Sequence, residues 1–91
     1  MSTIGNIKRF TLRALIRLQG LPWPDALLED TLQHALVPRP LLSDIREAKR
    51  ELELGGFIHG ETDDLDGQVT WTLTALGRHR ARQLDAGAAG R

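Results

Sequence analysis

The chain has 91 residues, no cysteine and a formal net charge of zero. This length is enough for one small domain with a single hydrophobic core, but not for a substrate cleft between domains, so an enzyme is not expected. The absence of cysteine excludes disulfide frameworks, thiolate zinc sites and thiol nucleophiles.

The sequence favours a soluble, cytoplasmic protein. No apolar run approaches the roughly 20 residues that cross a membrane, and the residues from Met1 to Ile4 lack the features of a signal peptide. The neutral net charge differs from the basic surplus of many DNA-binding domains. Charge alone therefore weakens the case for a nucleic-acid partner.

A first helix is expected from Ile4 to Gln19, because Gly20 and Pro22 end a run of apolar residues at helical spacing. One face of this helix is predicted to pack on the core, and it carries Ile7, Ala14, Leu15 and Leu18.

The rest of this first helix has an unusual surface. Arg9, Arg13 and Arg17 repeat every four residues as one solvated stripe, and Leu12 and Ile16 form a second apolar side beyond it. A helix that is apolar over most of its circumference needs cover from a second element. That cover is expected from either the C-terminal helix or a second subunit, and Leu12 and Ile16 are the candidate dimer interface.

The segment Leu21-Pro22-Trp23-Pro24 is predicted to be extended, with Trp23 as a core plug or spacer. A second helix then runs to Ala35, and Pro24 suits its first turn, where a missing N–H costs nothing. Its predicted core residues are Leu28, Leu32, Ala35 and Leu36. The prolines at positions 38 and 40 break the helix and form a turn.

A third helix is predicted from Leu41 to Leu54, ended by Gly55-Gly56, which can supply a left-handed C′ residue. Its two faces differ clearly in polarity. The predicted core face carries Leu41, Ile45, Ala48 and Leu52, and the opposite face carries Ser43, Arg46, Glu47 and Arg50.

A β-hairpin and a fourth helix complete the chain. Residues 57–59 and 69–73 have strand patterns on either side of an acidic turn, and in the second strand alternate residues Val69, Trp71 and Leu73 share one face. Thr74 is the expected N-cap of a helix over residues 75–84. Residues 1–85 are thus predicted to form one domain, followed by a flexible tail over residues 86–91.

Two segments in the second half of the chain carry a family resemblance: Leu52-Glu53-Leu54-Gly55-Gly56-Phe57-Ile58, and Trp71-Thr72-Leu73-Thr74-Ala75-Leu76-Gly77. Their pattern is similar to that of small bacterial winged helix-turn-helix proteins, including PadR-type and MarR-type regulators and related prophage proteins. The resemblance implies a mainly α fold with a three-helix core, a two-stranded wing and a C-terminal helix. It also implies a DNA-binding transcriptional regulator, which we expect to act as a homodimer.

If the resemblance extends to mechanism, the helix over residues 41–54 reads bases in the major groove of double-stranded DNA. The side chains expected to face DNA are Ser43, Arg46, Glu47 and Arg50, with Arg39 and Lys49 placed to contact phosphates. Arginine pairs bidentately with guanine, which gives sequence preference. The alternative is an ordinary solvated face whose opposite charges partly neutralise each other.

The expected wing departs from the family pattern, because its tip carries Glu61, Asp63, Asp64 and Asp66 where DNA-binding wings often carry basic residues. Either the wing points away from DNA, or the domain is a protein-interaction module that uses this acidic surface. The spacing does not match an EF-hand calcium loop, so no metal is expected.

Other polar residues give weaker signals. His34, His59 and His79 lie on separate elements without metal-ligand spacing, and no cofactor is expected. The basic run from Arg78 to Arg82 has two interpretations. In one, it contacts a phosphate or a neighbouring acidic surface. In the other, it is an ordinary helix segment in which the helix dipole favours basic residues near the C-terminal end. The sequence specifies no target DNA sequence, regulated gene or inducer.

Overall fold

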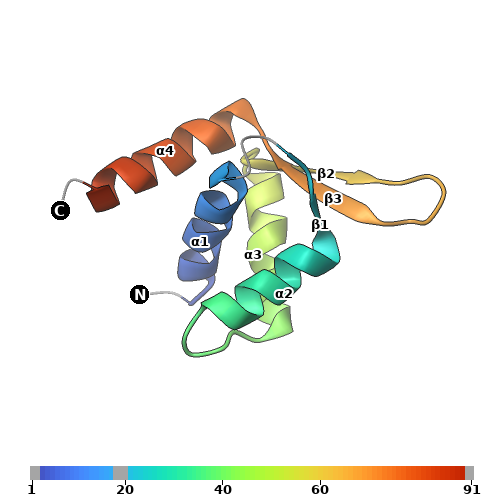
Figure 1. Cartoon of the computed structure of the whole chain (residues 1–91), viewed down its shortest axis with the longest axis horizontal. Helices are drawn as coiled ribbons and strands as arrows, with labels where there is room; N and C mark the ends of the chain where they lie inside the picture. The colour runs from blue at the N-terminus through green and yellow to red at the C-terminus, as the bar shows by residue number, and fades with distance from the viewer. Residues whose placement is uncertain (1–2, 18–20, 90–91) are drawn as a thin grey trace.

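The computed structural model describes residues 3–17 and 21–89, and in these ranges it shows four helices and a small antiparallel sheet (Figure 1). Expectations for residues 1–2, 18–20 and 90–91, including the end of the first helix and a core role for Leu18, lie outside the described residues. The elements in chain order are α1 (Thr3–Arg17), β1 (Trp23–Pro24), α2 (Asp25–Ala35), α3 (Leu42–Leu54), β2 (Ile58–Thr62), β3 (Val69–Leu73) and α4 (Ala75–Ala89).

The sheet has three antiparallel strands in the order β1-β3-β2. Strands β2 and β3 form the expected hairpin, and Gly60 faces Trp71 across it. The short β1 pairs Trp23 with Trp71 on the other side of β3, so the sheet has one strand more than the expected two-stranded wing. The extended segment predicted around Trp23 is confirmed, and its pairing ties the start of α2 to the hairpin.

Helices α1, α2 and α3 pack on one another, and the sheet and α4 complete the cover (Figure 1). The core residues of α2, α3 and β3 follow the predicted spacing, with two exceptions. Leu41 is 68% exposed, because it is the extended N-cap residue of α3 and lies off its helical face. Ala35 ends α2 and is exposed, while Leu36, the last of the predicted core residues of this segment, packs against the core. Fully buried side chains include Ile7, Leu15, Leu28, Leu32, Ile45 and Ile58.

The junctions on either side of the hairpin are built as the sequence predicts. Gly56 has φ +81 after the end of α3, the left-handed conformation that glycine adopts without strain. Thr74 is the N-cap of α4, since its Oγ1 accepts a hydrogen bond from the backbone N–H of Gly77 at 3.0 Å. The Thr74 hydroxyl also donates to the carbonyl of Gly56 at 2.6 Å, so one side chain links both junctions.

The C-terminal helix is longer than expected. It continues to Ala89 instead of ending at Leu84, so residues 86–89 of the predicted tail are helical. The alanines at 86, 88 and 89 favour a helix, and the Asp85 carboxylate forms an ion pair with Arg13 of α1 at 3.1 Å. Helix α4 therefore covers α1. No helix in the described ranges is long and apolar enough to cross a membrane.

Candidate nucleic-acid interface

The outward face of α3 carries most of the residues predicted to contact DNA. Ser43, Arg46 and Arg50 are exposed at helical spacing, Glu47 is half-buried at the edge of the face, and Arg39 is exposed in the preceding turn. This arrangement places three cationic side chains along one face of α3 and in the turn before it. Arg39 and Arg50 have no ion-pair partner among the described residues, so their charges face solvent.

Lys49 is the exception, and the prediction that it contacts phosphate is wrong. It is only 5% exposed, and its ammonium group lies between the carboxylates of Asp25 and Glu29, at 2.5 and 2.9 Å. A lysine buried to this degree needs paired carboxylates to offset the loss of hydration. Lys49 therefore holds α3 to α2 and has no free charge to offer a ligand.

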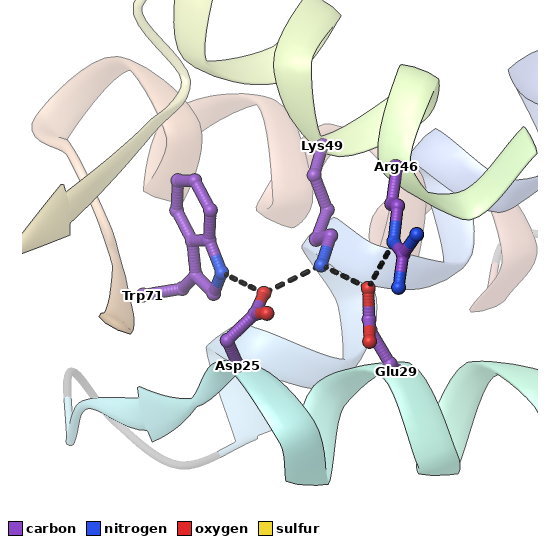
Figure 2. A network of polar contacts seen from close by, with 5 residues as sticks. All are labelled: Asp25, Glu29, Arg46, Lys49 and Trp71. Atoms are coloured by element: carbon purple, nitrogen blue, oxygen red, sulfur yellow. Dashed lines mark hydrogen bonds and ion pairs between the residues drawn. The ribbon is translucent and has the colours of Figure 1, made fainter. Parts of the chain in front are cut away.

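A polar network surrounds this lysine (Figure 2). Asp25 and Glu29 lie one turn apart on α2 and point toward α3, where Glu29 also accepts a 3.3 Å contact from Nε of Arg46. On the other side, Nε1 of Trp71 donates to Asp25 at 2.7 Å. The network thus joins α2, α3 and β3, and fixes the orientation of α3 relative to the sheet.

The electrostatics of Asp25 reflect this position. Burial would raise the pKa of its carboxyl group, but hydrogen bonds from Lys49 and Trp71, together with the charges of Lys49 and Arg46, lower it below the ordinary value of 3.8. Asp25 is therefore ionised in the folded protein at neutral pH. A second interhelical pair, Lys8 of α1 with Glu51 of α3 at 2.7 Å, lowers the pKa of Glu51 chiefly through its hydrogen bond.

A groove of about 280 Å³ opens above the network between α2, α3 and β3. Its walls are mixed in charge, and they include Arg46, Arg50 and Glu53 of α3 and Val69 of β3. Among the described residues no cluster of histidine, aspartate and glutamate has the arrangement of a metal site. The groove therefore offers charged hydrogen-bonding groups, and the described residues that line it do not form a metal site.

The hairpin tip (residues 63–67) is a turn held by side-chain hydrogen bonds to its own backbone. The Asp63 carboxylate accepts from the backbone N–H of Leu65 at 2.7 Å, and the Asp66 carboxylate accepts from that of Gln68 at 2.9 Å. These bonds hold Leu65 outward, where it is 97% exposed. Asp64 is also exposed, so the tip presents an apolar side chain surrounded by carboxylates.

The residues predicted as a dimer interface lie in different surroundings. Leu12 is 4% exposed and belongs to the core of its own chain, while Ile16 is half-buried against that core. Of the two covers expected for α1, the C-terminal helix is present, because α4 packs along α1. Leu12 is thus buried within its own chain and is not available to a second subunit.

A second cavity, of about 230 Å³, lies between α1, β1 and α2. Its described walls include the apolar side chains of Phe10, Ala14 and Trp23, and they also include Arg13, Arg17 and Thr31. Trp23 packs against the core as predicted, but its indole N–H is buried without an acceptor among the described residues. Arg17 is exposed, and together with Arg13 it makes part of the cavity wall basic.

The remaining basic and histidine residues are spread over the surface. His34, His59 and His79 are exposed on α2, β2 and α4, as are Arg78, Arg80 and Arg82 of α4. Ala81, within the basic run, is fully buried. Helix α4 therefore packs on the rest of the chain through a small residue, Ala81, and its basic side chains face solvent.

The polar network was not predicted, although the sequence contains part of its signal. Asp25 and Glu29 are spaced by one helical turn, and Lys49 borders the buried arc formed by Ile45, Ala48 and Leu52. These spacings place a cation and two anions on facing sides of two helices. Which pairs meet depends on how α2 crosses α3, and no local pattern specifies that crossing.

The described residues define a mainly helical domain with a three-stranded antiparallel sheet, in which α3 presents arginines on an exposed face. Comparison with protein-family models, curated proteins and solved structures finds no match.

Proposed function

We propose that the chain is a winged helix-turn-helix domain that binds duplex DNA with the outward face of α3. The order of elements supports this proposal. Helices α2 and α3 are consecutive, a turn joins them, and a hairpin follows α3. Strand β1, which lies between α1 and α2 in the chain, adds a third strand to the sheet. In this arrangement α3 is the second helix of the pair, the one that enters the major groove in helix-turn-helix proteins. The regulatory role implied by the family resemblance, and the cytoplasmic location expected from the sequence, belong to the same proposal.

The observation that carries the proposal is the exposure of Ser43, Arg46 and Arg50 on one face of α3. Arginine offers two donors in the geometry of guanine O6 and N7, and serine hydrogen-bonds to bases or phosphates. Arg39, in the turn before α3, suits a phosphate of the backbone. Two residues are left out of the proposed DNA contacts. Lys49 is buried in the network, and Glu47 is half-buried and carries a negative charge.

Glu29 has a positioning role in this proposal. It bonds to Nε of Arg46, which leaves the terminal nitrogens of the guanidinium group for a base. A side chain held in place before binding loses less conformational entropy on binding. The same contact neutralises part of the charge of Arg46, so we expect Arg50 to contribute more than Arg46 to phosphate attraction.

The test is a selection from random-sequence duplexes with the purified protein, followed by affinity measurements on the enriched and on an unrelated sequence. Arg50→Ala should reduce affinity for the enriched sequence by roughly 5- to 150-fold, which corresponds to about 1–3 kcal/mol. Arg82→Ala, an exposed arginine on α4, is the matched control and should change affinity little. The absence of any enriched sequence, or equal effects of the two substitutions, would contradict sequence-specific reading by α3.

A protein-interaction module is the second candidate, and the acidic hairpin tip favours it. Leu65 stands exposed among Asp63, Asp64 and Asp66, and this surface would repel a DNA backbone. If the module is the correct function, random duplexes show no enrichment, and Arg50→Ala leaves the cellular interactions of the protein intact. Substitution of Leu65 would disrupt them.

A further inference from the structure

The hairpin tip has the form of a docking ligand. Its turn is fixed by the hydrogen bonds of Asp63 and Asp66 and closed by a 2.7 Å bond from the Asp63 backbone N–H to the Gln68 carbonyl. Leu65 projects from this turn almost fully exposed. A turn ordered before binding loses little further entropy on binding, and an apolar side chain gains from leaving water.

The cavity at α1 is complementary to this tip. Phe10, Ala14 and Trp23 give it apolar walls, and Arg13 and Arg17 add positive charge to its lining. Arg13 is engaged by Asp85 through Nε only, and Arg17 has no hydrogen-bond partner among the described residues. The cavity, of about 230 Å³, has room for a leucine side chain. Apolar surface meets apolar surface, and carboxylates meet guanidinium groups.

We propose that the hairpin tip of one copy of this chain docks in the α1 cavity of a second copy, with Leu65 inserted and Asp64 facing Arg17. The hairpin extends away from the helices to one end of the molecule, and α1 lies within the helical part (Figure 1). The tip therefore cannot fold back into its own cavity, and the contact joins separate copies. Opposite charges also steer the two surfaces toward each other at low salt.

This contact is heterologous, since each copy offers a tip to one neighbour and a cavity to another. Association therefore continues beyond a pair, or closes into a ring, and increases with protein concentration. It also differs from a two-fold dimer through Ile16, in which both copies use the same surface. The inference does not depend on DNA binding.

The test is sedimentation velocity on the full chain over a concentration series up to about 1 mM, the range in which weak protein contacts are populated, at low and high salt. The wild-type average mass should rise with concentration at low salt and fall toward the monomer at high salt. Leu65→Ser and Arg17→Glu should each weaken association by about tenfold or more. Both residues are exposed, so thermal unfolding should remain close to wild type. Val37→Ser, which changes another exposed apolar residue, is the matched control and should associate like wild type.

A mixing experiment separates this contact from any symmetric one. Leu65→Ser keeps the cavity and Arg17→Glu keeps the tip, so the two variants, each monomeric alone, should form a one-to-one dimer when mixed. An indole N–H signal of Trp23 should shift in the Leu65→Ser copy on mixing, because that copy supplies the cavity. A wild-type chain that stays monomeric throughout, a mixture that does not associate, or an equal effect of Val37→Ser would overturn the proposal.

Discussion

The indole N–H of Trp71 and the ammonium group of Lys49 donate to the same atom, Oδ1 of Asp25, and the Trp71 bond measures 2.7 Å. The ammonium group of Lys49 also lies 6.0 Å from the centre of the Trp71 ring. The strand, the first turn of α2 and the middle of α3 are thereby linked through a single carboxylate. The orientation of the exposed face of α3 depends on this link.

Replacement of Asp25 should therefore destabilise the fold. In Asp25→Ala the Trp71 N–H loses its acceptor and Lys49 keeps only Glu29, so we expect a loss of about 1–3 kcal/mol in the free energy of unfolding. Urea denaturation measures it. Asp30→Ala, on the exposed side of α2, is the control and should cost about 0.5 kcal/mol or less. Similar losses in the two variants would show that the network adds no stability.

The same carboxylate should make stability depend on pH. The pKa of Asp25 in the folded chain lies below its ordinary value of 3.8, so the unfolded chain binds more protons in that range. Its contribution is fully present above the ordinary value and is lost as pH falls through the lower folded value. Glu51, whose pKa is also lowered, acts in the same direction.

Urea denaturation at a series of pH values from about pH 7 to about pH 3 tests this dependence. The free energy of unfolding should fall at the acidic end, and the fall should be smaller in Asp25→Asn, because that variant has no proton to gain at this site. Glu51→Gln should reduce it separately. An acid transition that is identical in Asp25→Asn and wild type would remove Asp25 from the explanation.

The features that could be predicted from the sequence are those set by neighbouring residues. The cap at Thr74, the left-handed Gly56 and the alternation of Val69, Trp71 and Leu73 each depend on a few adjacent positions, and each is found in the structure. Lys49 shows why the candidate site was harder to predict from the sequence than these local features. Its spacing leaves it at the margin of a buried face, and its burial depends on two carboxylates supplied by another helix.

Gly77 combines a local pattern with a distant contact. A Cβ at this position would overlap the backbone carbonyl of Phe57 and approach the Leu73 side chain. Helix propensity alone predicts that Gly77→Ala stabilises α4 by up to about 1 kcal/mol, but the clash with a backbone atom should reverse the sign and cost about 1–3 kcal/mol. Thermal or urea unfolding distinguishes the two. A stabilised Gly77→Ala variant would show that the chain there relaxes freely.

The separation between Lys49 and the exposed arginines leads to a paired prediction. Lys49→Gln should lower the free energy of unfolding by about 1–3 kcal/mol, because it leaves Asp25 without its paired cation and Glu29 with Arg46 alone. Arg50→Ala should leave stability within about 0.5 kcal/mol and reduce DNA affinity. Binding is measured at a temperature where both variants are folded. If folded Lys49→Gln loses as much affinity as Arg50→Ala, with an equal change in salt dependence, Lys49 has a direct role that its burial argues against.

The hairpin tip gives the last prediction, in which DNA binding and self-association respond in opposite directions. Changing Asp63, Asp64 and Asp66 together to Asn removes three negative charges but keeps the side-chain oxygens that accept from Leu65 and Gln68, so the turn should persist. With less repulsion of phosphate, DNA affinity should stay equal or increase, and the gain should be larger at low salt. Self-association through the α1 cavity should weaken, because Arg17 loses its carboxylate partner. Anisotropy with labelled duplex and sedimentation of the same sample measure both. A fall in DNA affinity would place the tip against the duplex, and unchanged self-association would remove its charge from the contact.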